Sequence, residues 1–231
     1  MAAPVPGGES DAGWIRRALN TMRRGSLIVI LGVVAITTVG CADKRVTLSY
    51  QPSPNLAPIG QPQPLTIRGF NDRRGDESDG DPTRVGGIYG GYGNRLSKVM
   101  ADSPLILTLL NALADGFKAR GVPVTVMVAP FAPGSAFSQG PILTGDLKNF
   151  STEARFTNSA HISAIVRLYG PAGALLVEKE VSERVRSDQG GGAGVFTDVG
   201  DLQRIMNEAL AKFVERVVTD PEIAPRLGRA P

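Results

Sequence analysis

The chain has 231 residues, a mean hydropathy of −0.01 and a formal net charge of +3 at pH 7. Residues 1–40 contain four arginines and two acidic residues, so 21 basic and 20 acidic side chains remain beyond them, a net charge of only +1. That balance excludes the strongly basic surface of a nucleic-acid-binding protein. The roughly 190 residues beyond position 40 are enough for one domain with a hydrophobic core.

The N-terminal segment has the pattern of a secretory signal. Arg23 and Arg24 precede an apolar run at residues 27–39. A helix of this length reaches only about 20 Å, whereas the hydrocarbon core of a bilayer is ~30 Å thick. The run therefore fits a signal peptide, residues 22–40. Residues 1–21 would make an unusually long leader, so we interpret them as a mis-assigned start or a disordered extension.

Cys41, the only cysteine, follows this run and is the predicted site of lipid attachment. Residues 38–41 resemble the bacterial lipobox, in which a small residue precedes a cysteine that receives diacylglycerol, although Thr38 stands where Leu is usual. An acyl chain on the same cysteine completes a lasting anchor, because stable attachment needs more than one chain. The alternative is an ordinary buried cysteine. By the sorting pattern that this arrangement resembles, Ala42 favours the outer membrane, while Asp43 leaves the inner membrane as an alternative.

Residues 41–64 are interpreted as the lipidated N-terminus, with a possible short strand around residues 46–50 and a proline-rich linker at residues 51–64. Such a stretch favours extended polyproline II at about 3.1 Å per residue. It acts either as a spacer that lifts the domain off the membrane or as a loop that wraps around the domain.

Residues 65–227 are predicted to form a single periplasmic α/β domain. Residues 86–93, rich in Gly and Tyr, are expected to be mobile. Strands and helices are predicted from their apolar periods of two and 3.6 residues: strands at 65–70, 96–100, 122–128, 142–156 (bent near Asn149), 162–168 and 175–185, and helices at 105–120 and about 198–219. Each helix has one apolar stripe and needs a surface to cover. The predicted fold class is therefore α+β: a two-layer sandwich with both helices on one face of a mainly antiparallel sheet.

Local signals predict the helix ends. Ser103 followed by Pro104 is typical of the start of a helix, and Gly121 of its end. The second helix is predicted to be capped by Asp198 or Asp201.

Few groups suggest catalysis. His161, the only histidine, alternates with core residues and is expected to point away from the core, so no Ser-His-Asp triad is supported. The acidic residues between positions 72 and 81 lack EF-hand spacing. The Gly-rich residues 189–194 lack the Lys-Ser/Thr ending of a phosphate-binding loop. We therefore assign no catalytic, cofactor-binding or metal-binding residue, expect no cofactor beyond the diacylglycerol and acyl chain on Cys41, and predict that the protein is not an enzyme.

The chain resembles the YajG-type family of bacterial lipoproteins over about residues 41–227. The resemblance rests on Cys41 behind its signal, a strand ending in Asp72-Arg73, Val85-Gly86, the helix at 105–120 with Gly121-Val122, residues 142–147, the strands after them and the terminal helix. Residues 86–93 and 129–141 are longer than the family pattern. The resemblance implies a monomeric α/β domain on the periplasmic side of the outer membrane, and it supplies no reaction or catalytic residues. The layout is also similar, at the level of the fold, to LptE-type lipopolysaccharide-assembly lipoproteins.

The leading hypothesis is an outer-membrane lipoprotein on the periplasmic face, with a non-enzymatic binding or scaffolding role. Its expected partners are the membrane, through the lipid, and an envelope protein or lipid, with no nucleic acid. A first alternative is an accessory subunit of a lipid or lipopolysaccharide transport machine, which requires an exposed apolar groove or free β edge. A second alternative is a cell-wall hydrolase, which requires two carboxyl groups in a cleft, roughly 5–10 Å apart.

Overall fold

The structure, a computed structural model, describes residues 43–131, 139–155, 157–187 and 198–228, apart from the side chains of Asp76 and Glu77. The strands are β1 (Lys44–Val46), β2 (Leu65–Gly69), β3 (Asn71–Asp72), β4 (Arg84–Tyr89), β5 (Arg95–Ala101), β6 (Val124–Pro130), β7 (Ile142–Ala154), β8 (Asn158–Tyr169) and β9 (Leu175–Arg186). The helices are α2 (Leu105–Ala119), α3 (Val199–Val218) and the short α4 (Ala224–Leu227), with a 3-10 turn, η1, at Gly75–Ser78.

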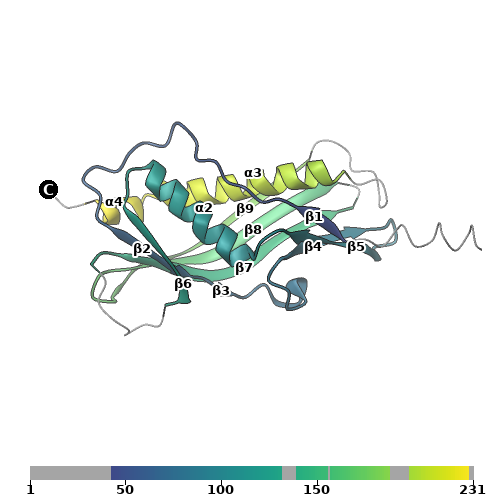
Figure 1. Ribbon diagram of the computed structural model, residues 1–231, viewed down its shortest axis with the longest axis horizontal. Helices are drawn as coiled ribbons and strands as arrows, with labels where there is room; N and C mark the ends of the chain where they lie inside the picture. Colours follow the sequence, from purple (N-terminus) through teal and green to yellow (C-terminus); the bar gives the residue numbers. More distant parts are fainter. Residues whose placement is uncertain (1–42, 132–138, 156, 188–197, 229–231) are drawn as a thin grey trace, which may run out of the picture. The chain divides into compact units, whose positions relative to one another are not determined.

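The described strands form one nine-stranded sheet built around β7. One edge of β7 pairs antiparallel with β8, and β8 pairs antiparallel with β9, so the three longest strands form a meander. The other edge of β7 pairs in parallel with β2, β3 and β4 in turn. From there the sheet continues as two branches, β2–β6 and β4–β5–β1 (Figure 1).

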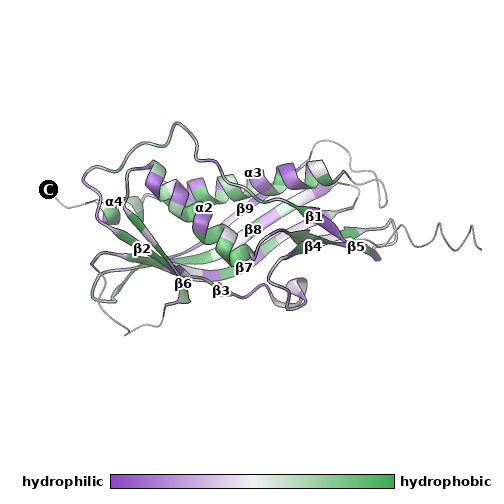
Figure 2. Cartoon of the chain, viewed as in Figure 1, coloured by the Kyte–Doolittle hydropathy of each residue, from purple (hydrophilic) through white to green (hydrophobic). Residues whose placement is uncertain are grey.

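Both long helices lie on the same face of this sheet. Helix α3 packs over β8 and β9, and α2 packs against α3 and over the β2–β6 branch (Figure 1). Each helix carries apolar and polar stripes, as Figure 2 shows. The predicted α+β two-layer arrangement is confirmed: two amphipathic helices bury their apolar stripes on one face of a large sheet.

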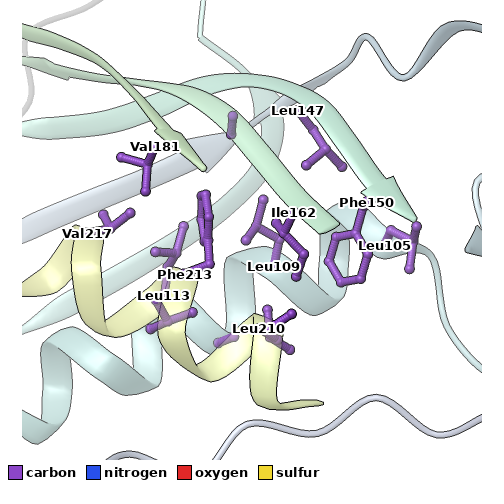
Figure 3. Close-up of a cluster of buried hydrophobic side chains, with 14 of the residues drawn as sticks. Leu105, Leu109, Leu113, Leu147, Phe150, Ile162, Val181, Leu210, Phe213 and Val217 are labelled. Atoms are coloured by element: carbon purple, nitrogen blue, oxygen red, sulfur yellow. The ribbon is translucent and has the colours of Figure 1, made fainter. Parts of the chain in front are cut away.

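The core lies between the helix layer and the sheet. Figure 3 shows Leu109 and Leu113 of α2 and Phe213 of α3 in one cluster with Ile162 of β8 and Phe150 of β7, between the helices and the sheet. These five side chains are almost wholly buried. Burial of each large apolar side chain contributes roughly 1.5–3 kcal/mol, so this cluster is the main stabilising element of the domain.

Two glycines are required by close approaches. A β-carbon on Gly116 of α2 would lie 2.7 Å from Val214 of α3, so this glycine lets the two helices approach each other. Gly86 in β4 has φ +145°, and a β-carbon there would lie 1.9 Å from the carbonyl oxygen of Thr152 in β7. Because any side chain at Gly86 would push β4 off β7, this residue joins the second branch to the sheet.

One predicted helix cap is confirmed and another is wrong. The Asp198 carboxylate accepts a hydrogen bond from the Gly200 N–H (2.8 Å) at the start of α3, as predicted. At the start of α2, Pro104 is the N-cap and no side chain caps the helix, so Ser103 does not have the predicted role. The Leu105 N–H, which has no acceptor within the helix, instead donates to the Pro82 carbonyl of a neighbouring loop (3.0 Å).

The prediction that residues 86–93 form a mobile loop is wrong for its first half. Residues 86–89 belong to β4, and a turn at residues 90–93 joins β4 to β5. Pairing with β5 on one side and β7 on the other orders these residues despite their glycines. The predicted bend in β7 is confirmed, because the register with β8 shifts between Leu147 and Asn149.

Residues 47–64 lie on the domain rather than standing away from it. Their backbone is held at both ends by side chains and loops of the helix layer: the Thr47 N–H donates to Gln203 (3.0 Å), and the Ile59 N–H donates to the Arg120 carbonyl (2.9 Å). The Arg120 side chain donates in return to Ala57 (2.7 Å). Strand β1, which precedes this segment, is already paired within the sheet, so the proline-rich residues wrap around the domain. Among the helices of the described chain, none combines the length and the apolarity needed to cross a membrane.

Candidate functional site

Several sequence features lie outside the described residues, among them Cys41, the predicted lipid-attachment residue, Ala42, and the Gly-rich residues 189–194. Cys41 stands three positions before Lys44, the first residue of β1. The signal peptide interpretation of residues 22–40 stays a prediction for the same reason.

His161 lies on β8 and points away from the core, as predicted. Its Nε2 atom is 3.0 Å from Ser182 Oγ of β9, so the two side chains form a hydrogen-bonded pair. Arg184, rather than a carboxylate, is the β9 residue directly opposite His161. The pair therefore differs from a Ser-His-Asp arrangement, in which a carboxylate orients the imidazole.

The acidic loop between β3 and β4 is held by ion pairs and hydrogen bonds. Arg74, which is buried, pairs with Asp72 at 2.7 Å and also donates to the Arg84 carbonyl. Burial alone raises the pKa of Asp72, but the hydrogen bonds from Arg74 outweigh this and hold the pKa below its usual value. The neighbouring Asp81 accepts two hydrogen bonds from Thr83, which lower its pKa.

Asp79, in the same loop, is shared by three cations. The buried Arg84 pairs with its carboxylate, and the more exposed Arg95 and Lys98 lie 3.5 and 3.7 Å from the same oxygen. Within the described part of the chain, no group of three or more His, Cys, Asp or Glu side chains is placed to hold a metal ion. Asp72 and Asp79 thus hold arginines, Asp81 holds Thr83, and Arg74 and Arg84 fasten the loop to β4.

The most distinctive surface is the outer edge of β9, which we call the β9 edge and define as residues 177–186. Strand β9 pairs with β8 on its inner side, whereas no described strand pairs with the β9 edge. Its side chains alternate strictly between the helix face and the open face of the sheet. An unpaired strand edge presents a row of free backbone donors and acceptors, which is a template for pairing with another strand.

Two charged residues of the β9 edge point toward the helix face, among valines. Lys179 Nζ lies 2.7 Å from Asp220 and 3.4 Å from Glu222, both just beyond the end of α3. Glu183 pairs with Arg216 of α3. These ion pairs fasten the edge of the sheet to the C-terminal half of α3.

A cavity of about 430 Å³ lies between this strand and the end of α3. It is lined by residues 179–182 and by Arg216 and residues 219–221. Asp220 is 4% exposed. Burial raises its pKa, but the hydrogen bond from Lys179 and two backbone N–H groups outweigh this and hold the pKa below its usual value. A general acid of a glycosidase needs a raised pKa, so Asp220 has the opposite property.

On the open face of the sheet, polar side chains cross the three meander strands. Arg167 of β8 pairs with Asp146 of β7 at 2.8 Å and with Glu178 of β9. Asn71 donates to the other oxygen of Asp146 (2.8 Å). These interactions fix the spacing of the strands and leave the neighbouring backbone edge of β9 available.

The exposed large apolar side chains do not form a groove in the described part of the chain. Tyr92 lies in a turn, Leu107 in α2, Met127 and Val128 in β6 and Leu175 at the start of β9. A second cavity, of about 180 Å³, lies between α2 and residues 48–50 and is lined by both polar and apolar side chains. Neither these exposed side chains nor the second cavity provides the long apolar lining that binding an acyl chain requires.

Sequence reasoning found the residues of β9 but not their significance. The alternation of Val177, Val181 and Val185 predicted the strand, yet nothing in a single sequence marks a strand as an edge. The signal that was present is the placement of Lys179 and Glu183 between those valines, since inward-pointing charges are typical of edge strands.

Comparison with known proteins identifies the fold. No family model and no curated protein sequence matches the chain. Among solved structures, the fold is similar to protein XCC0632 from Xanthomonas campestris, described by the family model DUF330, with a TM-score of 0.52 and 15% sequence identity over 80% of this chain and 95% of that one. A likeness at this identity shows the fold alone.

Two further solved structures are more distant. One is a candidate lipoprotein from Caulobacter crescentus, with a TM-score of 0.35 and 17% identity over 52% of this chain and 80% of that one. The other is lipoprotein GNA1162 from Neisseria meningitidis, with a TM-score of 0.29 and 14% identity over 64% of this chain and 94% of that one. Both scores are too low to carry an argument about this chain.

Proposed function

We propose that the chain is a lipid-anchored lipoprotein of the bacterial outer membrane whose domain binds or scaffolds a partner on the periplasmic face and catalyses no reaction. The observation that carries the proposal is the position of Cys41, the only cysteine, directly between a signal-like apolar run and the first strand of the domain. Membership of the YajG-type family is part of the same proposal.

This position has a structural consequence. Three residues of extended chain span about 10 Å, so an anchor on Cys41 would hold β1 close to the membrane surface. Since residues 47–64 wrap around the domain, they do not add reach between the anchor and the sheet. The domain is therefore expected to work at the membrane, without a long tether.

The binding role is supported by the β9 edge. It offers backbone hydrogen-bonding groups over ten residues, together with an adjacent cavity, and ion pairs of Lys179 and Glu183 hold it to the end of α3. Strand addition to such an edge is a common way for proteins to recognise one another. The same edge also meets the requirement of the accessory-subunit hypothesis, in which the partner is a component of a lipid or lipopolysaccharide transport machine.

The anchor is tested by intact-mass analysis of the protein extracted from membranes. The expected mass is that of residues 41–231 plus a diacylglycerol and an acyl chain. A Cys41→Ser variant should lose this added mass and leave the membrane fraction, while an Asp43→Asn variant, two positions away, should keep both. Recovery of unprocessed wild-type chain with a free thiol would refute the proposal.

Membrane choice and binding are tested separately. Ala42→Asp is expected to move the protein from the outer to the inner membrane fraction in a sucrose gradient. Crosslinking in intact envelopes, followed by affinity purification, should enrich a partner with the wild-type chain and not with the soluble Cys41→Ser chain. If the anchored chain enriches nothing beyond that control, the binding role is wrong even where the anchor is confirmed.

A further inference from the structure

The β9 edge is unusually long and regular for an unpaired strand. Over residues 177–186 it pairs with β8 without a register shift, and the one irregularity lies earlier, at Leu176. Natural edges are usually short, bulged or interrupted by proline. This edge has none of these features, and its protection from unselective pairing comes from its charges, above all Lys179 and Glu183, which point inward among its valines.

Pairing of the β9 edge with the same edge of a second copy has a strict geometry. The two strands run antiparallel around a two-fold axis perpendicular to the sheet, and this axis leaves each side chain on its own face. Directly opposite residues share a face, so the axis must pass through a residue of the strand. Only a few registers therefore exist, and the charges along the strand distinguish them.

With the axis at Val181, no like charges lie opposite each other, and Glu180 lies opposite the neutral Ser182. Lys179 of one copy lies opposite Glu183 of the other on the helix face, and Glu178 lies opposite Arg184 on the open face. Val177 lies opposite Val185, and Val181 meets its own counterpart. Each of these pairs occurs twice because of the symmetry, apart from the one at the axis itself.

The neighbouring registers fail. An axis at residue 178, 179, 180, 183 or 184 places a charged residue opposite its own copy, and like charges directly opposite each other are destabilising. An axis at Ser182 avoids this, but it places Lys179 and Glu183 opposite valines on the helix face. An axis at Arg186 places that arginine opposite its own copy, an axis at Val185 places Arg184 opposite Arg186, and an axis at Val177 places Lys179 opposite Leu175. Val181 is thus the only position of the β9 edge that brings complementary charges together on both faces.

We propose that the β9 edge pairs with the β9 edge of a second copy of this chain, in the register centred on Val181, and so continues the sheet across a two-fold axis. This inference rests on the proposed function, because two copies anchored to one membrane meet at a high effective concentration. It replaces the monomer that the family resemblance implies with a dimer.

The ion pairs already present fit this arrangement. Lys179 is held by Asp220, and Glu183 by Arg216, in each copy. In the dimer the contact between Lys179 and the second copy's Glu183 joins the two pairs into one network that crosses the axis. If the incoming strand had a purely apolar inner face, Lys179 and Glu183 would have no counterpart across the edge. These two residues therefore disfavour pairing with such strands.

The register is tested by single cysteines in the full-length, membrane-anchored chain. Opposite residues of an antiparallel pair have Cα atoms about 4.5–5.5 Å apart, within the range of a disulfide. Val181→Cys should therefore give a disulfide-linked dimer as the major species on a non-reducing gel. Val177→Cys and Val185→Cys are matched controls on the same face; their own copies lie about 26 Å apart in the dimer and should stay monomeric.

Charge reversal in the Val181→Cys background tests the same register independently. Arg184→Glu places two like-charged pairs across the axis and should reduce disulfide formation by Val181→Cys at least tenfold, whereas Arg73→Glu, on the far side of the sheet, should not. Coexpression of Arg184→Glu with Glu178→Arg should restore crosslinking between the two different chains, because each reversed charge then faces its complement. Circular dichroism of each variant reports whether the domain is folded.

The outcomes separate the two proposals. A lipidated, membrane-bound chain in which the Val181→Cys variant crosslinks no better than the Val177→Cys variant overturns the self-pairing and leaves the proposed function standing. Efficient crosslinking of the Val177→Cys or Val185→Cys variant also overturns the register. An unlipidated wild-type chain overturns the proposed function whatever the crosslinks show.

Discussion

The β6 and β9 edges of the sheet are both unpaired among the described strands, yet they are protected in different ways. Strand β6 has seven residues, begins just after Pro123, ends at Pro130 and shows a register shift against β2. It contains no charged residue, and Met127 and Val128 are exposed. Strand β9 has twelve residues, no proline and charges of both signs.

This difference shows that geometry and charge protect an edge with different selectivity. A proline and an irregular register remove backbone groups or misplace them, so they hinder every incoming strand alike. Inward-pointing charges hinder only those strands that cannot neutralise them. The β9 edge therefore keeps the ability to pair with a complementary strand, whereas the β6 edge does not.

The largest effect is expected from truncating a core residue of α3, the helix that packs over β8 and β9. Phe213 of α3 is 0% exposed in the core, so Phe213→Ala should lower the free energy of unfolding by about 3–5 kcal/mol. Val128→Ala at the other edge removes a side chain that is 61% exposed and should change it by less than about 0.5 kcal/mol. Urea denaturation followed by circular dichroism measures both. Similar losses from the two variants would mean that β6 is buried against something else.

Asp220 tests the charged attachment of β9 to α3. Asp220→Asn keeps the size of the side chain but weakens its hydrogen bonds with Lys179 and with the N–H groups of Glu222 and Ile223. We expect a loss of about 1–3 kcal/mol at pH 7, as for hydrogen bonds to a charged group.

The pH dependence of this loss follows from the lowered pKa of Asp220 in the folded state. The stabilisation is fully present above the unfolded-state pKa of about 3.9 and is lost as the pH falls through the folded-state pKa. The difference between wild type and Asp220→Asn should therefore shrink between about pH 5 and pH 2. Glu222→Gln, which alters an exposed group near the same lysine, is the control and should change stability by less than about 0.5 kcal/mol. A loss that persists undiminished at the acid end of this range would contradict the role of the carboxylate charge.

Periodicity in the sequence predicted most of the fold, because the buried face of a helix or strand is marked by regularly spaced apolar residues. The valines of β9 and the apolar stripe of α3, from Leu202 to Val217, are visible in the sequence without any knowledge of their partners. Strand β4 was missed because it has few apolar residues of its own and is held in place by pairing with β5 and β7. Strand β5 is also poor in apolar residues, and β7 is distant in the sequence. Gly86, which signals a loop in isolation, is required there by the carbonyl of Thr152.

The candidate site was harder to predict than the fold. Whether β9 lies at an edge depends on how the other described strands pair, which no local pattern contains. The contact between Lys179 and Asp220 joins residues forty-one positions apart, and these two residues meet only when α3 packs on the sheet. By contrast, the prediction for Cys41 rests on local sequence alone and needs a chemical test rather than a structural one.

A smaller change in stability is expected at Tyr50, close to β1. Tyr50 follows this strand and packs near Gly116, and its hydroxyl oxygen is buried with no hydrogen-bond partner among the described residues. Burial, together with Glu215 and Asp115, raises the pKa of Tyr50 to about 12. Tyr50→Phe removes a hydroxyl that has lost its hydration, so stability should stay equal or rise by up to about 1 kcal/mol.

Thermal denaturation measures the effect of Tyr50→Phe, and Tyr89→Phe on the second branch is the matched control. Absorbance at about 295 nm, where tyrosinate absorbs, should show that Tyr50→Phe removes the tyrosine that ionises with a pKa of about 12. A clear loss of stability in Tyr50→Phe would mean that the hydroxyl has a partner, such as a bound water in the neighbouring cavity.

The smallest change in stability, and a direct test of the contrast between the edges, is expected at Pro130. Pro130→Thr restores a backbone donor at the end of β6 without removing buried apolar surface, so the free energy of unfolding should change by about 0.5 kcal/mol or less. Because β6 has no charges to select a partner, its association should be unselective and should rise with protein concentration. Light scattering of detergent-solubilised protein should detect this association in the variant and not in the wild type.

A lysine at Val128 supplies the control for this last variant. In the double variant Val128→Lys/Pro130→Thr, an edge charge again protects β6, and the association should disappear. If Pro130→Thr does not associate, the irregular register between Arg68 and Gly69 is sufficient to protect the edge by itself. If the double variant associates as strongly as the single one, charge does not protect edges in this sheet, and Lys179 and Glu183 do not make the β9 edge selective.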